Sequence, residues 1–270
     1  MFKLDALYHA IENKKPYFGK SILGIQGNPE RQRHMTDLVK NICSHRSAKP
    51  LKILEIGSWA GASAVTWASA IQKYNKGLGQ VFCVDSWESS NTSPSNQEGW
   101  DLHMNNLLKN DFIYQMFIHN IQYSGCNSIV TAFRGYSKDI VPNFAPNSFD
   151  IIYIDAAHDY ESVKNDIKNS KPNLITNGIL CGDDLELEFN KVDNEELLIH
   201  LNSGKDYCLD SKTGLYYHPG VTMALSEEIL TVGSKDGFWF VQKDKNDNWK
   251  KFEFHTSTQM PSHIAKVYIL

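Results

Sequence analysis

The sequence of 270 residues lacks the features of several protein classes. Its five cysteines are odd in number and widely spaced, with no Cys-x-x-Cys, which argues against a disulfide framework and against a zinc site. No apolar run approaches the length of a membrane span, and residues 1–5 contain an acid and lead into no apolar signal-peptide core. We therefore expect a cytoplasmic protein with reduced thiols and no membrane partner.

Basic residues are too few and too scattered for a nucleic-acid binder. The chain has 27 Lys and Arg against 31 Asp and Glu, a formal net charge of -4, and the short run from Lys243 to Lys251 is interrupted by acids. Proteins that bind a phosphate backbone usually carry a basic excess on one face, so we expect no nucleic-acid partner. The content of 41% hydrophobic and 11% aromatic residues is enough for one large α/β core.

Residues 51–71 predict a strand, a tight loop and a helix. An apolar run stops at Gly57, a second glycine follows at Gly61, and small residues then recur at helical spacing. Such a unit places backbone N–H groups and a helix N-terminus beside a ligand at the carboxyl end of the strand, where open α/β sheets bind ligands. The expected ligand-binding residues of this segment are Glu55, Gly57, Ser58, Gly61 and Ser63.

The same loop indicates what kind of ligand it binds. Trp59 stands where the dinucleotide-binding pattern needs a glycine for the approach of a pyrophosphate, so a pyrophosphate is disfavoured. Glu55 adds a carboxylate that would repel phosphates but attract a cationic amine or a sulfonium. S-adenosylmethionine carries both of these cations and is the expected cofactor.

The next two predicted strands end in further candidate binding residues. The run at 80–85 ends in Asp85, where a carboxylate accepts hydrogen bonds from ribose hydroxyls; the alternative is a turn residue or helix cap. Trp87 either covers the adenine or packs on the loop. After a third strand at 127–133, Ser137 is either a hydrogen-bond donor beside the adenine or the cap of an ordinary strand-to-helix turn.

Acids gather at the ends of the fourth and fifth predicted strands. The nearly continuous apolar run 148–155 suits a strand buried on both faces; it ends in Asp155, with His158 three residues on. The run 177–182 stops at Asp183 and Asp184. Neighbouring parallel strands therefore present three carboxylates and an imidazole at one edge of the sheet.

This cluster suggests metal-assisted chemistry on a hydroxyl. Three like charges are costly unless a cation neutralises them, and Mg²⁺ would accept Asp155, Asp183 and Asp184 while leaving positions for water and substrate oxygens. His158, with an unperturbed pKa of about 6.5, could take the proton of an acidified hydroxyl, and the alkoxide would attack the sulfonium methyl. The alternative assigns Asp155 to methyl-donor binding or helix capping, the acidic pair to loop structure, and the histidine to a local hydrogen bond.

The motifs together resemble one family. The set resembles the class I S-adenosylmethionine-dependent methyltransferases, and in particular the metal-dependent sugar O-methyltransferases of macrolide biosynthesis and the related cephalosporin-hydroxylase-like group. The resemblance covers residues 51–243. The motifs that carry it are Glu55-x-Gly57, Asp85, Asp155-x-x-His158 and Gly182-Asp183-Asp184.

The resemblance implies roles for the acids and the histidine. In that family the first aspartate and an acidic pair bind magnesium, and the histidine three residues after the first aspartate is the general base. The family often has Glu-Asp as its acidic pair, whereas this chain has Asp183-Asp184, so the shorter Asp183 is the least certain ligand. Glu186 or Glu188 could reach the metal instead, although we expect both on a solvated turn.

The resemblance also implies the Rossmann-like class I methyltransferase fold of the α/β class. Its features are a mostly parallel seven-stranded sheet, helices on both faces and a C-terminal antiparallel hairpin. Two β runs at 229–233 and 237–242, joined by a turn signal, predict that hairpin here. We expect the methyltransferase domain at 51–243, an N-terminal helical extension and lid at 1–50, and a C-terminal extension at 244–270.

The leading hypothesis is a magnesium-dependent O-methyltransferase that acts on a hydroxyl of a sugar, a nucleotide sugar or a glycosylated small molecule. A phenolic acceptor is the alternative, because an aromatic diol meets a metal much as a sugar diol does. An NAD-dependent oxidoreductase is disfavoured by Trp59 and the clustered acids, and a non-catalytic binding subunit by the intact set Asp155, His158 and Asp184. The sequence leaves a homo-oligomer open.

Overall fold

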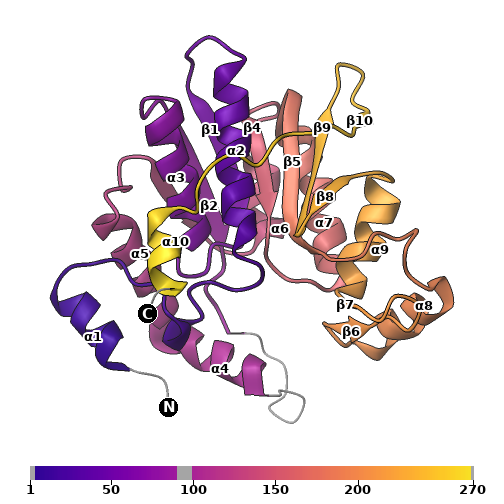
Figure 1. The fold of residues 1–270 in the computed structure, drawn as a ribbon, viewed down its shortest axis with the longest axis horizontal. Coiled ribbons are helices and arrows are strands. Elements are labelled where there is room, and N and C mark those ends of the chain that lie inside the picture. The colour runs from indigo at the N-terminus through magenta and orange to yellow at the C-terminus, as the bar shows by residue number, and fades with distance from the viewer. Residues whose placement is uncertain (1–3, 90–98, 269–270) are drawn as a thin grey trace.

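A mixed β-sheet forms the centre of the protein (Figure 1). The computed structural model describes residues 4–89 and 99–268. The strands of the sheet are β1 (Leu51–Ile56), β2 (Gly79–Asp85), β3 (Val130–Arg134), β4 (Phe149–Ile154), β5 (Leu174–Leu185), β8 (Gly233–Lys235), β9 (Gly237–Lys243) and β10 (Trp249–Lys250). Over the described residues this sheet has eight strands in the order β10-β9-β5-β4-β1-β2-β3, with β8 also paired to β9. Strands β1 to β5 are parallel, and β9 is antiparallel to β5, β8 and β10.

Helices cover both faces of the sheet, because its central strands are apolar on both sides. Strand β4 is buried at every position: Ile151 and Tyr153 join one core cluster, and Ile152 and Ile154 the other. Helices α2, α3 and α5 pack in the first cluster, and α7 and α9 in the second. The helices are α1 (Leu4–Glu12), α2 (Glu30–Ser44), α3 (Ala62–Tyr74), α4 (Gly99–Leu108), α5 (Phe112–Tyr123), α6 (Ser137–Ile140), α7 (Tyr160–Ser170), α8 (Asn194–Ser203), α9 (Pro219–Glu228) and α10 (Ser262–Tyr268), with short 3₁₀ helices at Lys20–Ile22, Lys109–Asp111, Val141–Asn143 and Lys171–Asn173.

The two terminal segments pack on the sheet as parts of one core. Leu7, Phe18 and Met35 from the N-terminal segment are buried in the same cluster as Phe254 and Ile264 from the C-terminal segment. In Figure 1, α10 lies beside the helices that cover this face of the sheet. The N-terminal extension, the methyltransferase domain and the C-terminal extension expected from the sequence therefore all contribute side chains to this one core cluster.

The fold predicted from the sequence is confirmed, with one local correction. The sheet is mainly parallel with antiparallel strands at its C-terminal end, but the hairpin is β8 with β9, so its first strand lies at 233–235 and not at 229–233. Leu230 is 84% exposed and lies outside the hairpin. Pairing starts at Gly233, where a Cβ would lie 2.5 Å from the Phe240 ring. The two-residue strand β10 adds an eighth strand within the described residues.

The region between β5 and β9 forms a small lobe beside the sheet. It contains α8, α9 and a two-stranded sheet of β6 (Cys208–Leu209) and β7 (Tyr216–Tyr217), which pair antiparallel. Leu187, Leu197 and Tyr217 belong to a core cluster of this lobe. Within the described parts of the chain, none of the helices combines the length and apolar character that crossing a membrane requires.

Candidate functional site

The crevice of the sheet lies at the carboxyl ends of β1 and β4. Strands β2 and β3 lie on one side of β1, and β4 and β5 on the other, which is where open α/β sheets bind ligands. Gly57, directly after β1, has φ +86°, and a Cβ there would lie 2.0 Å from the carbonyl oxygen of Asp155. A glycine is therefore required at this position, and the loop after β1 touches the end of β4.

Asp85 holds the loop after β1. One of its carboxylate oxygens accepts hydrogen bonds from the backbone N–H groups of Ser58 and Trp59, each at 2.9 Å, and the other accepts from the N–H of Trp87 at 2.7 Å. These contacts correspond to the alternative in which Asp85 is a turn residue. A carboxylate has about four acceptor positions, so the one that remains can still accept a ligand hydroxyl.

Trp87 packs beneath this loop. Its side chain is 1% exposed, donates a hydrogen bond to the carbonyl oxygen of Trp59 at 2.8 Å, and packs against Phe117 with the rings tilted and their centroids 4.8 Å apart. The indole thus supports the loop, as in the second of the two sequence-based alternatives. A cavity of about 480 Å³ opens next to it at the ends of β2 and β3, lined among others by Arg134 and Tyr136.

Ser137 is held by a helix on the other face of the sheet. Its hydroxyl donates to the carboxylate of Asp166 on α7 at 2.6 Å. Burial raises the pKa of Asp166 to about 6, against the lowering effect of this hydrogen bond. In this structure Ser137 therefore occupies an ordinary strand-to-helix turn, and its neighbours Arg134 and Tyr136 reach the cavity instead.

Glu55 and Ser63 are bonded to each other inside the protein. Glu55 is 0% exposed, and the hydroxyl of Ser63 donates to its carboxyl group at 2.8 Å. Burial raises the pKa of Glu55 to about 8, although the hydrogen bond from Ser63 opposes this. Without a cationic ligand nearby, the Glu55 carboxyl group is therefore mostly neutral at pH 7.

Because of this buried acid, we expect Glu55→Gln to resist alkaline pH better than the wild type. The folded-state pKa of about 8 lies above the ordinary 4.5, so the contribution of Glu55 to stability is full at low pH and falls as pH rises from 4.5 to 8. The loss amounts to about 5 kcal/mol above pH 8. Thermal unfolding at pH 5 and pH 8 measures it, with Glu253→Gln at an exposed position as control. An equal pH dependence in all three proteins would contradict the burial argument.

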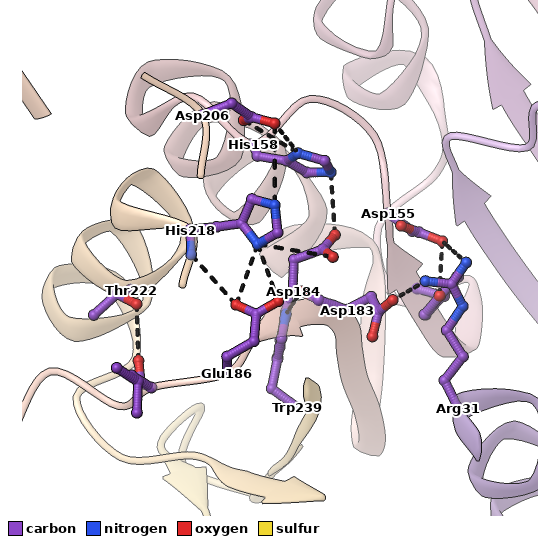
Figure 2. Close-up of polar contacts among 12 residues, drawn as sticks. Arg31, Asp155, His158, Asp183, Asp184, Glu186, Asp206, His218, Thr222 and Trp239 are labelled. Atoms are coloured by element: carbon purple, nitrogen blue, oxygen red, sulfur yellow. Dashed lines mark hydrogen bonds and ion pairs between the residues drawn. The ribbon is translucent and has the colours of Figure 1, made fainter. Parts of the chain in front are cut away.

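Three of the predicted residues at the ends of β4 and β5 come together. Asp155, His158 and Asp184 each offer a potential ligand atom, and these atoms lie within 4.8 Å of one another. His158 Nε2 lies 3.1 Å from Asp184 Oδ2, and Tyr153 donates a hydrogen bond to Asp155 Oδ2 at 2.8 Å (Figure 2). The sequence predicted a cluster of carboxylates and an imidazole at this edge of the sheet, and in the structure these three residues lie together.

The carboxylate of Asp183 is turned toward Arg31 and not toward His158. It pairs with Arg31 of α2, while the carboxylate of Asp184 faces the histidines (Figure 2). The pairing of β5 with β9 is irregular between Gly182 and Leu185, and Asp184 has φ +67°, so the two neighbouring acids project in different directions. The structure therefore does not support Asp183 as a third metal ligand.

A second part of the cluster comes from His218, Glu186 and Asp206. For His218 the sequence left two alternatives, a residue of the acceptor pocket and a histidine of a surface turn; Glu186 was expected on a solvated turn, and Asp206 was missed. His218, before α9, lies 3.1 Å from both carboxylate oxygens of Glu186, and its ring centroid lies 4.5 Å from that of His158. Glu186 thus faces the cluster and is not on a solvated turn. Asp206 lies 3.1 Å from His158 Nδ1. No local sequence pattern singles out Asp206, because a long-range approach brings it to the site.

Electrostatic effects within the cluster are strong. Burial alone would lower the pKa of His158, but its hydrogen bonds and charge interactions with Asp184 and Asp206 raise that pKa well above its usual value. Burial alone would raise the pKa of Asp184, but the hydrogen bond and charge of His158, with the charges of His218 and Arg31, lower it to about 2. Without a further cation, His158 is therefore an imidazolium paired with carboxylates.

The donor set fits a divalent cation. Burial raises the pKa of Asp155, and the charge of Asp184 adds to this effect even though Arg31 opposes it. The carboxylates of Asp155 and Asp184, whose ligand atoms lie within 4.8 Å of one another and of His158, can hold an ion such as Mg²⁺ or Mn²⁺, and the ion would also offset the charge of Asp184 that acts on His158.

Comparisons with known proteins agree with this geometry. A family model described as a methyltransferase domain matches residues 54–185, from β1 to the end of β5. No curated protein matches the chain. The structure of the O-methyltransferase NovP aligns with a TM-score of 0.54 at 14% identity over 80% of each chain. Cofactor-bound Rv0187 from MTB aligns with a TM-score of 0.50 at 16% identity, over 88% of this chain and 87% of that one.

The protein therefore has the class I methyltransferase fold, and the part of the chain from β1 to the end of β5 is similar to a methyltransferase domain. The resemblance seen in the sequence is confirmed at this level. The matched residues include Glu55, Asp85, Asp155 and Asp184, but exclude Arg31, Asp206 and His218.

Proposed function

We propose that the protein transfers a methyl group from S-adenosylmethionine to a hydroxyl oxygen. The observation that carries this proposal is the contact between Gly57, in the loop after β1, and Asp155, whose carboxylate belongs to the cluster with His158 and Asp184. A donor bound on the loop and an acceptor bound at the cluster would be neighbours. The match of the domain to a methyltransferase family supports the type of reaction.

His158 is the proposed general base. Its Nδ1 lies 3.1 Å from Asp206, which can hold the proton on that nitrogen, and its Nε2 faces Asp184. Nε2 is then the nitrogen that accepts the proton of the acceptor hydroxyl. Asp155 and Asp184 are the residues that would hold Mg²⁺, which when bound lowers the pKa of a hydroxyl and fixes its position.

The proposed acceptor is a sugar or a glycosylated small molecule, including a nucleotide sugar. Asp206 and His218 extend the cluster beyond His158, so polar groups that can bind several hydroxyls lie side by side. Tyr207 and Tyr216 are about half exposed, and their rings stack with centroids 5.2 Å apart, with Tyr207 next to His218. Such rings can pack against the flat face of a sugar or of an aromatic aglycone.

Incubation with methyl-labelled S-adenosylmethionine and a panel of glycosides, nucleotide sugars and catechols tests the proposal. We expect label transfer to a glycoside or nucleotide sugar, its loss after thorough chelation with EDTA, and its return with Mg²⁺. Calorimetry with S-adenosylmethionine and NAD side by side should show binding of the first alone. Full turnover after chelation would remove the metal from the mechanism, and transfer to catechols alone would overturn the sugar acceptor.

A further inference from the structure

Arg31 from α2 reaches into the acid cluster. Its Nη2 lies 3.6 Å from Asp155 Oδ2, and its Nη1 forms an ion pair with Asp183 (Figure 2). The side chains of Arg31 and Asp183 are 7% and 3% exposed. The buried guanidinium of Arg31 therefore links Asp155, after β4, to Asp183, at the end of β5.

The neighbours of Arg31 along α2 fix its position. Each of the next three residues is bonded to a different part of the protein, so the helix has little freedom to withdraw the guanidinium. The bonds are Gln32 with Thr66 at 2.6 Å, Arg33 with the carbonyl of Thr258 at 3.0 Å and His34 with Asp236 at 3.0 Å. Gly27 closes the other side, because a Cβ there would lie 2.8 Å from Arg31 Nη1.

The pairing with Arg31 determines which acids remain for a cation. Among the described residues, three groups have ligand atoms close enough together to hold one ion. Asp155 and Asp184 occur in these groups, and Asp183 occurs in none of them. Yet Asp183 is adjacent in sequence to Asp184 and lies at the same strand end. A carboxylate bonded to a fixed guanidinium has to give up a charge-assisted contact before it can bind a metal.

We propose that Arg31 is a positioning residue that keeps Asp183 out of the metal site and steadies Asp155, so that Asp155 and Asp184 hold the ion beside His158. The inference rests on the proposed function, because it concerns the metal of that reaction. It makes α2, outside the matched domain, a part of the active site.

Mn²⁺ binding without turnover tests this role, with free Mn²⁺ measured by electron paramagnetic resonance. Arg31→Gln removes a positive charge next to Asp155 and frees a carboxylate, so we expect it to tighten Mn²⁺ binding by about tenfold or more. Lys40→Gln makes the same charge change at an exposed position of the same helix, where Lys40 bonds to Ser257, and should leave Mn²⁺ affinity unchanged.

The double variant Arg31→Gln/Asp183→Asn keeps the net charge of the wild type and guards against misfolding from an unpaired buried acid. We expect its Mn²⁺ affinity within about threefold of the wild type, a difference below 1 kcal/mol. If the double variant bound Mn²⁺ more than tenfold more weakly than the wild type, Asp183 would be a ligand and the inference would be overturned. The inference would also be overturned if the wild type bound Mn²⁺ and Arg31→Gln bound it no more tightly. Binding in Arg31→Gln but not in the wild type would support the inference and remove the metal from the proposed function. If neither binds, both fail.

Discussion

Asp184→Asn is expected to lower kcat/KM for methyl transfer by about 10³-fold, since the Lewis-acid contribution of a catalytic metal is several kcal/mol. Among the described residues, Asp184 belongs to two of the three groups of potential metal ligands. One of its oxygens lies 3.1 Å from His158 Nε2, and the other lies 3.9 Å from His218 Nδ1. An amide keeps the shape but removes the charge, so the cation and the orientation of His158 are both affected.

Glu188→Gln is the matched control for this prediction. Glu188 lies on the same segment after β5 but pairs with Lys191 and belongs to none of the potential ligand groups of the described residues. Methyl transfer measured at saturating Mg²⁺ should be unchanged in this variant. If Asp184→Asn kept more than a tenth of wild-type kcat/KM while Mn²⁺ binding was also retained, the assignment of Asp184 as a ligand would be wrong.

The sequence was informative about the fold because the sheet follows local rules. The apolar run that ends at Gly57 and the run before Asp155 both form buried parallel strands, and acids after such strands meet at one edge of the sheet. The hairpin was placed too early because residues 229–233 have strand composition, whereas in the structure pairing begins only at Gly233, opposite Phe240. Composition alone does not carry that information.

The candidate site was only partly predictable for a similar reason. Asp155 and Asp184 lie at strand ends and His158 follows Asp155 by three residues, so their proximity follows from topology. The different directions of the two neighbouring acids depend on the irregular end of β5, which has no sequence signal of its own. Arg31 and Asp206 reach the site from α2 and from the lobe between β5 and β9. Their approach depends on long-range packing, which periodicity and motif spacing do not encode.

His158→Gln is expected to lower kcat by about 10² to 10⁴-fold, the usual contribution of a general base. Glutamine can replace the hydrogen bonds of the imidazole but cannot take up a proton from a hydroxyl at neutral pH. Binding of S-adenosylmethionine should stay within about twofold of the wild type, because the proposed donor residues lie on the loop after β1 and the base acts on the acceptor. Single-turnover methyl transfer and calorimetry measure the two effects separately.

His45→Gln, at an exposed position after α2, is the control for loss of a histidine. Asp206→Asn should give an intermediate loss of about tenfold, because Asp206 orients His158 through Nδ1 without touching the reacting hydroxyl. This order of effects separates a base from a purely electrostatic residue. If His158 only neutralised Asp184, then His158→Lys would preserve turnover, since a lysine keeps a positive charge next to that carboxylate. We expect His158→Lys to be as inactive as His158→Gln, since an ammonium at neutral pH cannot accept the proton.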